Sequence, residues 1–123
     1  MSLREKLLSG PKKPLHSVVI DGESYYLRHP TIGAQDAARV AGGVSVDASG
    51  KSQIGNMPKF QASLLISLAV DEGNKPLFEA TDMAALCEAE IGSPLAKLMG
   101  EAVKLIGEAN EAGKNSTPPT EPA

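Results

Sequence analysis

The residues that could do chemistry in this chain are few, and their spacing assembles no catalytic site. The 123 residues contain two histidines and one cysteine. His16 and His29 fall near opposite ends of two predicted strands, without the further ligands that a zinc ion requires. Cys87 lies among apolar residues at helical spacing, with no histidine or basic residue nearby to activate its thiol. We therefore expect exposed histidines on the strands and a small core residue at Cys87.

Three other short motifs also fall short of a site. Gly50-Lys51-Ser52 is similar to the end of a phosphate-binding loop, but Ser45 stands where that motif needs its first glycine, and no buried strand precedes it. Glu88 and Glu90 are two residues apart on a predicted helix and therefore point in different directions. The run 71–74 lacks the alternating ligands of a calcium loop. We expect no catalytic residue, no cofactor and no metal, and hence a protein that is not an enzyme.

Composition narrows the possible partners. The net charge is −3 and aromatic residues make up only 3% of the chain, which disfavours both phosphate neutralisation and base stacking, the two main modes of nucleic-acid binding. A single cysteine cannot form an intramolecular disulfide. No stretch approaches the roughly 20 apolar residues of a membrane span or the apolar segment of a signal peptide. We expect a cytoplasmic protein that binds neither nucleic acid nor membrane.

The clearest β signal lies near the N-terminus. Asp21-Gly22 supplies the positive φ angles of a tight turn between predicted strands at residues 16–20 and 24–29. Alternation places four apolar side chains on one face of this hairpin, which we expect to pack on helices because an isolated hairpin is barely stable. These four are Val18, Ile20, Tyr25 and Leu27.

Capping residues mark where the helices begin. Ser2 is a predicted N-cap, and Glu5 completes a capping box with it. Thr31, Asn56 and Ser93 are further predicted N-caps. We predict helices over residues 3–8, 32–41, 56–70, 82–91 and 94–109.

Two segments lack such periodicity. Residues 42–56 contain four glycines and three serines and are predicted to form a mobile loop that is functional or becomes ordered on a partner. Leu77 and Phe78 are expected to anchor the turn before them to the core. The run 111–123 has no large apolar residue and is predicted to be a disordered tail.

Together these elements predict an α+β fold that is mostly helical. An N-terminal β-hairpin, at about residues 16–29, is expected to pack on a small bundle of about four helices. Residues 1–110 would form this single domain and residues 111–123 the tail.

One order of motifs is distinctive. Ser2-Leu3-Arg4-Glu5-Lys6-Leu7-Leu8 opens the chain, Tyr26-Leu27-Arg28 lies in the second strand, Thr31–Ala37 enters a helix, and Leu68–Phe78 contains the turn Asp71-Glu72-Gly73-Asn74-Lys75-Pro76. In this order the motifs resemble those of the tail assembly chaperones of long-tailed bacteriophages. The family's turn is similar to Val-Asp-Glu-x-Gly-Lys-Pro-Leu-Phe, with its glycine placed differently from that of this chain.

The resemblance implies a role in tail morphogenesis. Such chaperones bind the tape-measure protein transiently, keep it soluble while the tail tube assembles, and leave before the tail is complete. A longer form made by ribosomal frameshifting is thought to recruit tail tube protein. The resemblance thus implies action in the host bacterial cytoplasm and absence from the mature virion.

The apolar stripe on helix 56–70 is broader than one docking face requires. One interpretation is a central core helix; the other is a helix that also meets a second chain. On the second interpretation, Leu65→Asp should weaken the coating of the tape-measure protein. Several self-associating copies bound along that protein would add avidity. The predicted partner-binding residues are Phe60, Leu64, Leu65, Leu68, Leu98, Val103 and Ile106.

Two other functions stay open. A structural subunit of the phage tail or connector, retained in the virion, could use the same small α+β domain to form rings. A small enzyme or regulator with a ligand pocket is the third, although the sequence contains no paired catalytic groups.

Overall fold

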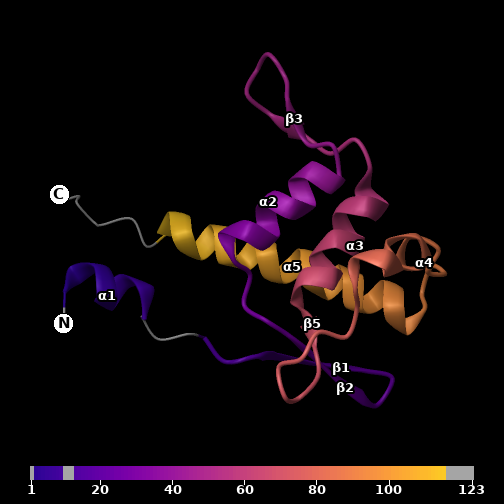
Figure 1. Ribbon diagram of the computed structural model, residues 1–123. Coiled ribbons are helices and arrows are strands. Elements are labelled where there is room, and N and C mark those ends of the chain that lie inside the picture. The colour runs from indigo at the N-terminus through magenta and orange to yellow at the C-terminus, as the bar shows by residue number, and fades with distance from the viewer. Residues whose placement is uncertain (1, 10–12, 116–123) are drawn as a thin grey trace.

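The computed structural model describes residues 2–9 and 13–115 (Figure 1). It confirms the predicted fold class, because a β-hairpin near the N-terminus packs against a mostly helical body. Figure 1 shows the hairpin along one side of the crossing helices α3 and α5, and α1 standing apart. In chain order the elements are α1 (Leu3–Leu8), β1 (His16–Ile20), β2 (Glu23–Leu27), α2 (Ile32–Ala41), β3 (Ser45–Val46), β4 (Ser52–Gln53), α3 (Met57–Leu68), β5 (Ala69–Val70), a 3₁₀ turn η1 (Ala80–Asp82), α4 (Met83–Cys87) and α5 (Pro94–Asn115).

The hairpin forms as its sequence predicts. Asp21 and Gly22 have φ angles of 51° and 84°, the left-handed conformations that a two-residue hairpin turn needs. The register pairs Val18 with Tyr25, so the predicted apolar face is continuous. On that face Val18, Ile20 and Leu27 are buried, and Tyr25 packs partly against the core.

The predicted helix over residues 56–70 ends earlier, at Leu68, because the chain turns into a third strand. Strand β5 pairs antiparallel with β2, so the sheet order is β1-β2-β5. The backbone N–H of Arg28 donates to the carbonyl oxygen of Leu68 at 2.8 Å. A strand of two residues has no periodicity of its own, so only its pairing with other segments defines it: with β2, and through the bridge between Val70 and Pro76.

Residues 42–56 contain a short hairpin where the sequence predicts a mobile loop. Strands β3 and β4 pair antiparallel, and the hairpin projects from the helical body (Figure 1). The Asp47 carboxylate accepts hydrogen bonds from the Ser49 hydroxyl at 2.6 Å and from the backbone N–H of Lys51 at 2.9 Å. These bonds, the Ser49 hydroxyl first, lower the pKa of Asp47 below its ordinary value of 3.8. Their stabilisation is therefore present above that pH and is lost as the pH falls through the depressed pKa.

The last two predicted helices differ from the structure at their ends. Helix α4 ends at Cys87 instead of Ile91, and Ile91 is fully exposed; a longer helix would have no core contact for it. Ser93 caps α5 as predicted, accepting a hydrogen bond from the backbone N–H of Ala96 at 3.2 Å. Helix α5 continues to Asn115 instead of about Ala109. The part of the predicted tail over residues 116–123 lies outside the described residues.

Helices α2 and α3 approach closely at Gly42. A Cβ built on Gly42 would lie 2.7 Å from the Cβ of Phe60 and 3.2 Å from the carbonyl oxygen of Ala38. Only a residue without a side chain fits there without moving the start of α3.

We therefore expect Gly42→Ala to lower the free energy of unfolding by about 1–3 kcal/mol, the usual cost of overpacking. Gly107→Ala is the matched control, because a Cβ at Gly107, inside α5, meets nothing within 4 Å. This control should raise stability by about 0.5–1 kcal/mol through helix propensity. Urea unfolding of both variants measures the difference; equal effects would contradict the close packing.

Candidate partner-binding site

Five of the seven residues predicted to bind a partner are core residues. Leu64 and Leu65 are 0% exposed, and Leu68, Leu98 and Ile106 are also buried. Phe60 and Val103 are partly buried and pack against the same core. The structure thus brings all seven together, but inside the chain.

This placement corrects the prediction that these side chains form a free apolar surface. The stripe on α3 is broad because α3 packs on several neighbours at once: it contacts α2, α4 and α5. A helix covered on several sides needs apolar residues over most of its circumference. A partner-binding surface of this fold therefore has to be made mainly by other residues.

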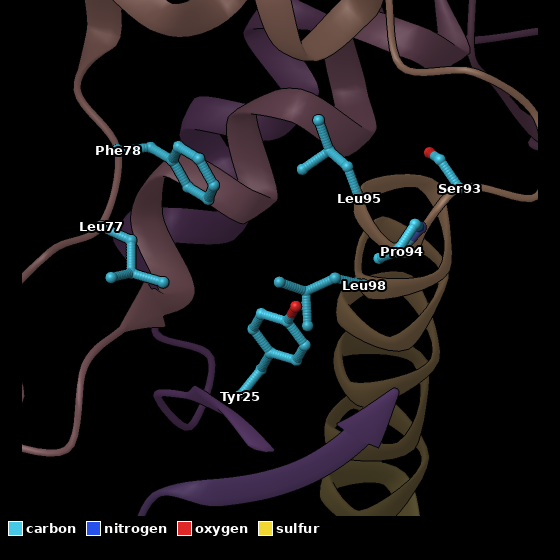
Figure 2. A pocket seen from close by; sticks show the side chains of 7 residues that line it. All are labelled: Tyr25, Leu77, Phe78, Ser93, Pro94, Leu95 and Leu98. Carbon is cyan, nitrogen blue, oxygen red and sulfur yellow. The ribbon is translucent and has the colours of Figure 1, made fainter. Parts of the chain in front are cut away.

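An apolar groove opens at the place where β2, the turn after β5 and the start of α5 meet (Figure 2). Its volume is about 360 Å³. Of the predicted residues only Leu98 lines it. The residues of this apolar groove are Tyr25, Leu77, Phe78, Ser93, Pro94, Leu95 and Leu98.

Leu77 is the most exposed apolar side chain at this groove. It is 45% exposed, which corrects the expectation that it anchors the turn to the core. Its backbone N–H donates to the carbonyl oxygen of Ala69 at 3.1 Å, so the backbone is fixed while the side chain remains available. Phe78, by contrast, is half-buried and packs against the core as expected.

The turn that presents Leu77 is held to the sheet by Arg28. The Arg28 Nε atom donates to the side-chain oxygen of Asn74, and its terminal nitrogen donates to the backbone oxygen of Asn74, both at 2.8 Å. Asn74 has φ of 66°, a left-handed conformation that asparagine tolerates better than most residues.

An acidic strip borders the apolar groove. A second hollow of about 250 Å³ shares Tyr25 and Leu77 with it and is also lined by Glu23, Asp71 and Glu72. The Asp71 carboxylate accepts from the backbone N–H groups of Gly73 and Lys75, at 2.8 and 3.0 Å. These two linings contain three carboxylates and no lysine or arginine among the described residues, so a segment with apolar and basic side chains would complement them.

The residues considered for chemistry lie apart. His16 is exposed opposite Leu27, whereas His29 follows β2 and lines a different hollow. The Cys87 sulfur is half-buried and lies 4.0 Å from the Met83 sulfur. Lys51 directly precedes β4, opposite Asp47 in the β3–β4 hairpin. Among the described residues, no group of three or more histidine, cysteine or acidic side chains could hold a metal ion, and no helix could span a membrane.

Comparison with solved structures finds similarity to a phage protein. No family model matches this chain, and no curated protein matches it. The structure of the bacteriophage HK97 tail assembly chaperone aligns with a TM-score of 0.48 and 22% sequence identity, over 85% of this chain and 95% of that chain. The chain is similar to a phage tail assembly chaperone. The motifs of the sequence resemble the same family.

Sequence reasoning missed most of the groove because it assigned function to the most apolar helix. Leu77 was visible within the turn motif Lys75-Pro76-Leu77-Phe78, but nothing in the sequence distinguishes its exposed side chain from the half-buried Phe78 next to it. Tyr25 and Leu95 were visible as apolar positions on a strand and a helix. Their convergence at one groove depends on tertiary packing.

Aspartate substitutions at Leu65 and Leu77 test which of these leucines lies in the core and which lies at the surface. We expect Leu65→Asp to prevent folding, since it places a carboxylate where the side chain is fully buried and removes a leucine whose loss alone costs about 2–5 kcal/mol. Leu77→Asp should remain folded with a nearly unchanged melting temperature. Circular dichroism during thermal unfolding measures both; a folded, stable Leu65→Asp variant would contradict the core assignment.

Proposed function

We propose that this chain is a tail assembly chaperone that holds an amphipathic helix of the tape-measure protein in its apolar groove and keeps it soluble while the tail tube forms. The observation that carries the proposal is the open apolar groove around Leu77, built by a turn that belongs to the family motif. The order of the sequence motifs supports the family assignment. The proposal is one of binding, without catalysis.

Helix-in-groove recognition suits the shape of this site. An amphipathic helix places apolar anchors at i, i+3 and i+4 spacing along one face. Tyr25, Leu77 and Leu95 supply aromatic and aliphatic contacts from three separate elements. The acidic strip formed by Glu23, Asp71 and Glu72 favours client helices with basic residues beside their apolar face.

The size of the groove predicts weak, reversible binding by each copy. Burying one leucine contributes about 1.5–3 kcal/mol, so two or three anchors yield a total close to the association cost of about 4–15 kcal/mol. A long client bound by several copies gains avidity without a strong single site. Weak individual contacts then allow release as tail tube subunits polymerise around the client.

The rest of the proposal follows the family. The chaperone would act in the host bacterial cytoplasm, a frameshifted longer form would contact tail tube protein, and the chain would be absent from the mature virion. The alternative is a structural tail or connector subunit that stays in the particle.

Substitution at the groove tests client binding. Leu77→Asp should weaken binding to helical fragments of the tape-measure protein about 10- to 100-fold, because an anchor contact worth about 1.4 kcal/mol or more is lost. Ile32→Asp is the matched control, since Ile32 is 90% exposed at the start of α2 and outside the groove. Fluorescence anisotropy with labelled fragments gives both affinities. Equal binding by the two variants would refute the groove as the client site.

The presence or absence of the chain in purified virions distinguishes the two candidate functions. A transient chaperone should be present in lysates of infected cells and missing from purified particles, whereas a structural subunit should be found in particles at fixed stoichiometry. Quantitative mass spectrometry of both samples measures this ratio. Stoichiometric recovery from particles would overturn the chaperone proposal in favour of the structural subunit.

A further inference from the structure

The hollow lined by His29 lies at the end of the hairpin opposite its turn, where the chain enters β1 and leaves β2 for α2 (Figure 1). Its volume is about 630 Å³, which exceeds that of the apolar groove. Among the described residues it shares no lining residue with that groove or with the acidic strip. Three basic side chains line it, those of Lys13, Arg28 and His29, and we call it the basic hollow.

The charge of the basic hollow is not balanced by the chain itself. Of residues 2–9 and 13–115, no aspartate or glutamate lines it. Within the part of the chain that the structure describes, no carboxylate forms an ion pair with Lys13, Arg28 or His29. The chain as a whole has a net charge of −3, so this hollow is a local exception that an acidic partner would complement.

The other polar side chains of the basic hollow are left mainly as hydrogen-bond donors. The Thr31 hydroxyl oxygen accepts from the backbone N–H of Ala34 at 3.0 Å, which leaves its proton to donate. The side-chain oxygen of Asn74 accepts from Arg28 at 2.8 Å, which leaves its NH₂ group. An ionised carboxylate can only accept hydrogen bonds, so it matches this set of donors.

Arg28 is held in place before any ligand binds. Its backbone N–H donates to the carbonyl oxygen of Leu68, and its side chain donates twice to Asn74. A guanidinium has more N–H groups than these two bonds use, so others remain for a ligand. A side chain that is already fixed loses little rotamer freedom on binding, which lowers the cost of association.

We propose that the basic hollow is a second binding site, which takes an acidic segment of a partner protein and holds one of its carboxylates between Lys13, Arg28 and His29. Leu15 and Pro30 also line the hollow and contact an apolar residue next to that carboxylate. The volume is many times the roughly 30 Å³ of one water molecule, which favours a peptide over a small anion. The site does not depend on the proposed function, because the acidic strip beside the apolar groove selects basic clients.

NMR titration of the isotope-labelled full chain with an acetylated Glu-Leu-Glu peptide tests the site. The amide signals of Lys13, Leu15, His29 and Thr31 should shift and saturate. A Gln-Leu-Gln peptide is the matched ligand control, since it has nearly the same size without the charge, and should cause no saturable shift. Saturable binding of both peptides with equal affinity would overturn the inference.

Charge reversal at Lys13 tests the contact in the protein. Lys13 is exposed, so Lys13→Glu should remain folded and should weaken peptide binding about tenfold, because a repulsion replaces an attraction. Lys59→Glu is the matched control: it makes the same charge change at the exposed start of α3 and should bind like the wild type. Equal weakening by the two variants would mean nonspecific attraction and would refute the site.

Inorganic phosphate distinguishes a peptide site from a site for small anions. Phosphate should displace the Glu-Leu-Glu peptide only at concentrations well above those at which the peptide binds. Displacement at lower concentrations would show that the hollow takes a small anion, and the proposal would then be wrong.

Binding of tape-measure fragments separates this site from the apolar groove. Lys13→Glu should leave the affinity for these fragments unchanged, and Leu77→Asp should leave the affinity for the Glu-Leu-Glu peptide unchanged. If Leu77→Asp loses the peptide, the two sites are not independent and the inference is wrong. If the fragments bind equally to Leu77→Asp and the wild type while the peptide results hold, the second site stands and the proposed client site is wrong.

Discussion

The structure depends on the burial of one apolar helix on several sides. Leu64, Leu65 and Leu68 of α3 are almost completely buried, and α2, α4 and α5 all pack against this helix. In a chain with so few aromatic residues, these aliphatic contacts supply most of the hydrophobic stabilisation. The close approach of α2 at Gly42 is part of the same constraint.

The use of α3 as the core decides where a partner can bind. Since its leucines are covered by the chain's own helices, a partner has to use apolar surface elsewhere, such as the place where β2, the turn after β5 and the start of α5 meet. The turn after β5 brings Leu77 to such a place, and the two hydrogen bonds from Arg28 to Asn74 hold that turn against the sheet. The groove thus results from the way the sheet and the start of α5 pack against each other.

The carboxylates beside the groove restrict the orientation in which a partner can bind. Carboxylates at Glu23, Asp71 and Glu72 lie along one border of the groove. Complementary charge fixes the orientation of a weak apolar contact and selects among partners.

The sequence by itself determined the local structure. The Asp21-Gly22 turn, the caps at Ser2, Thr31 and Asn56, and the α+β class follow from preferences of a few neighbouring residues, which act in the same way in any context. Strand β5 and the exposure of Leu77 were decided by the tertiary structure. A two-residue strand exists only when another strand pairs with it. Whether a leucine is core or surface depends on which distant elements cover it, and the periodicity of an apolar stripe shows how wide the stripe is without showing what covers it.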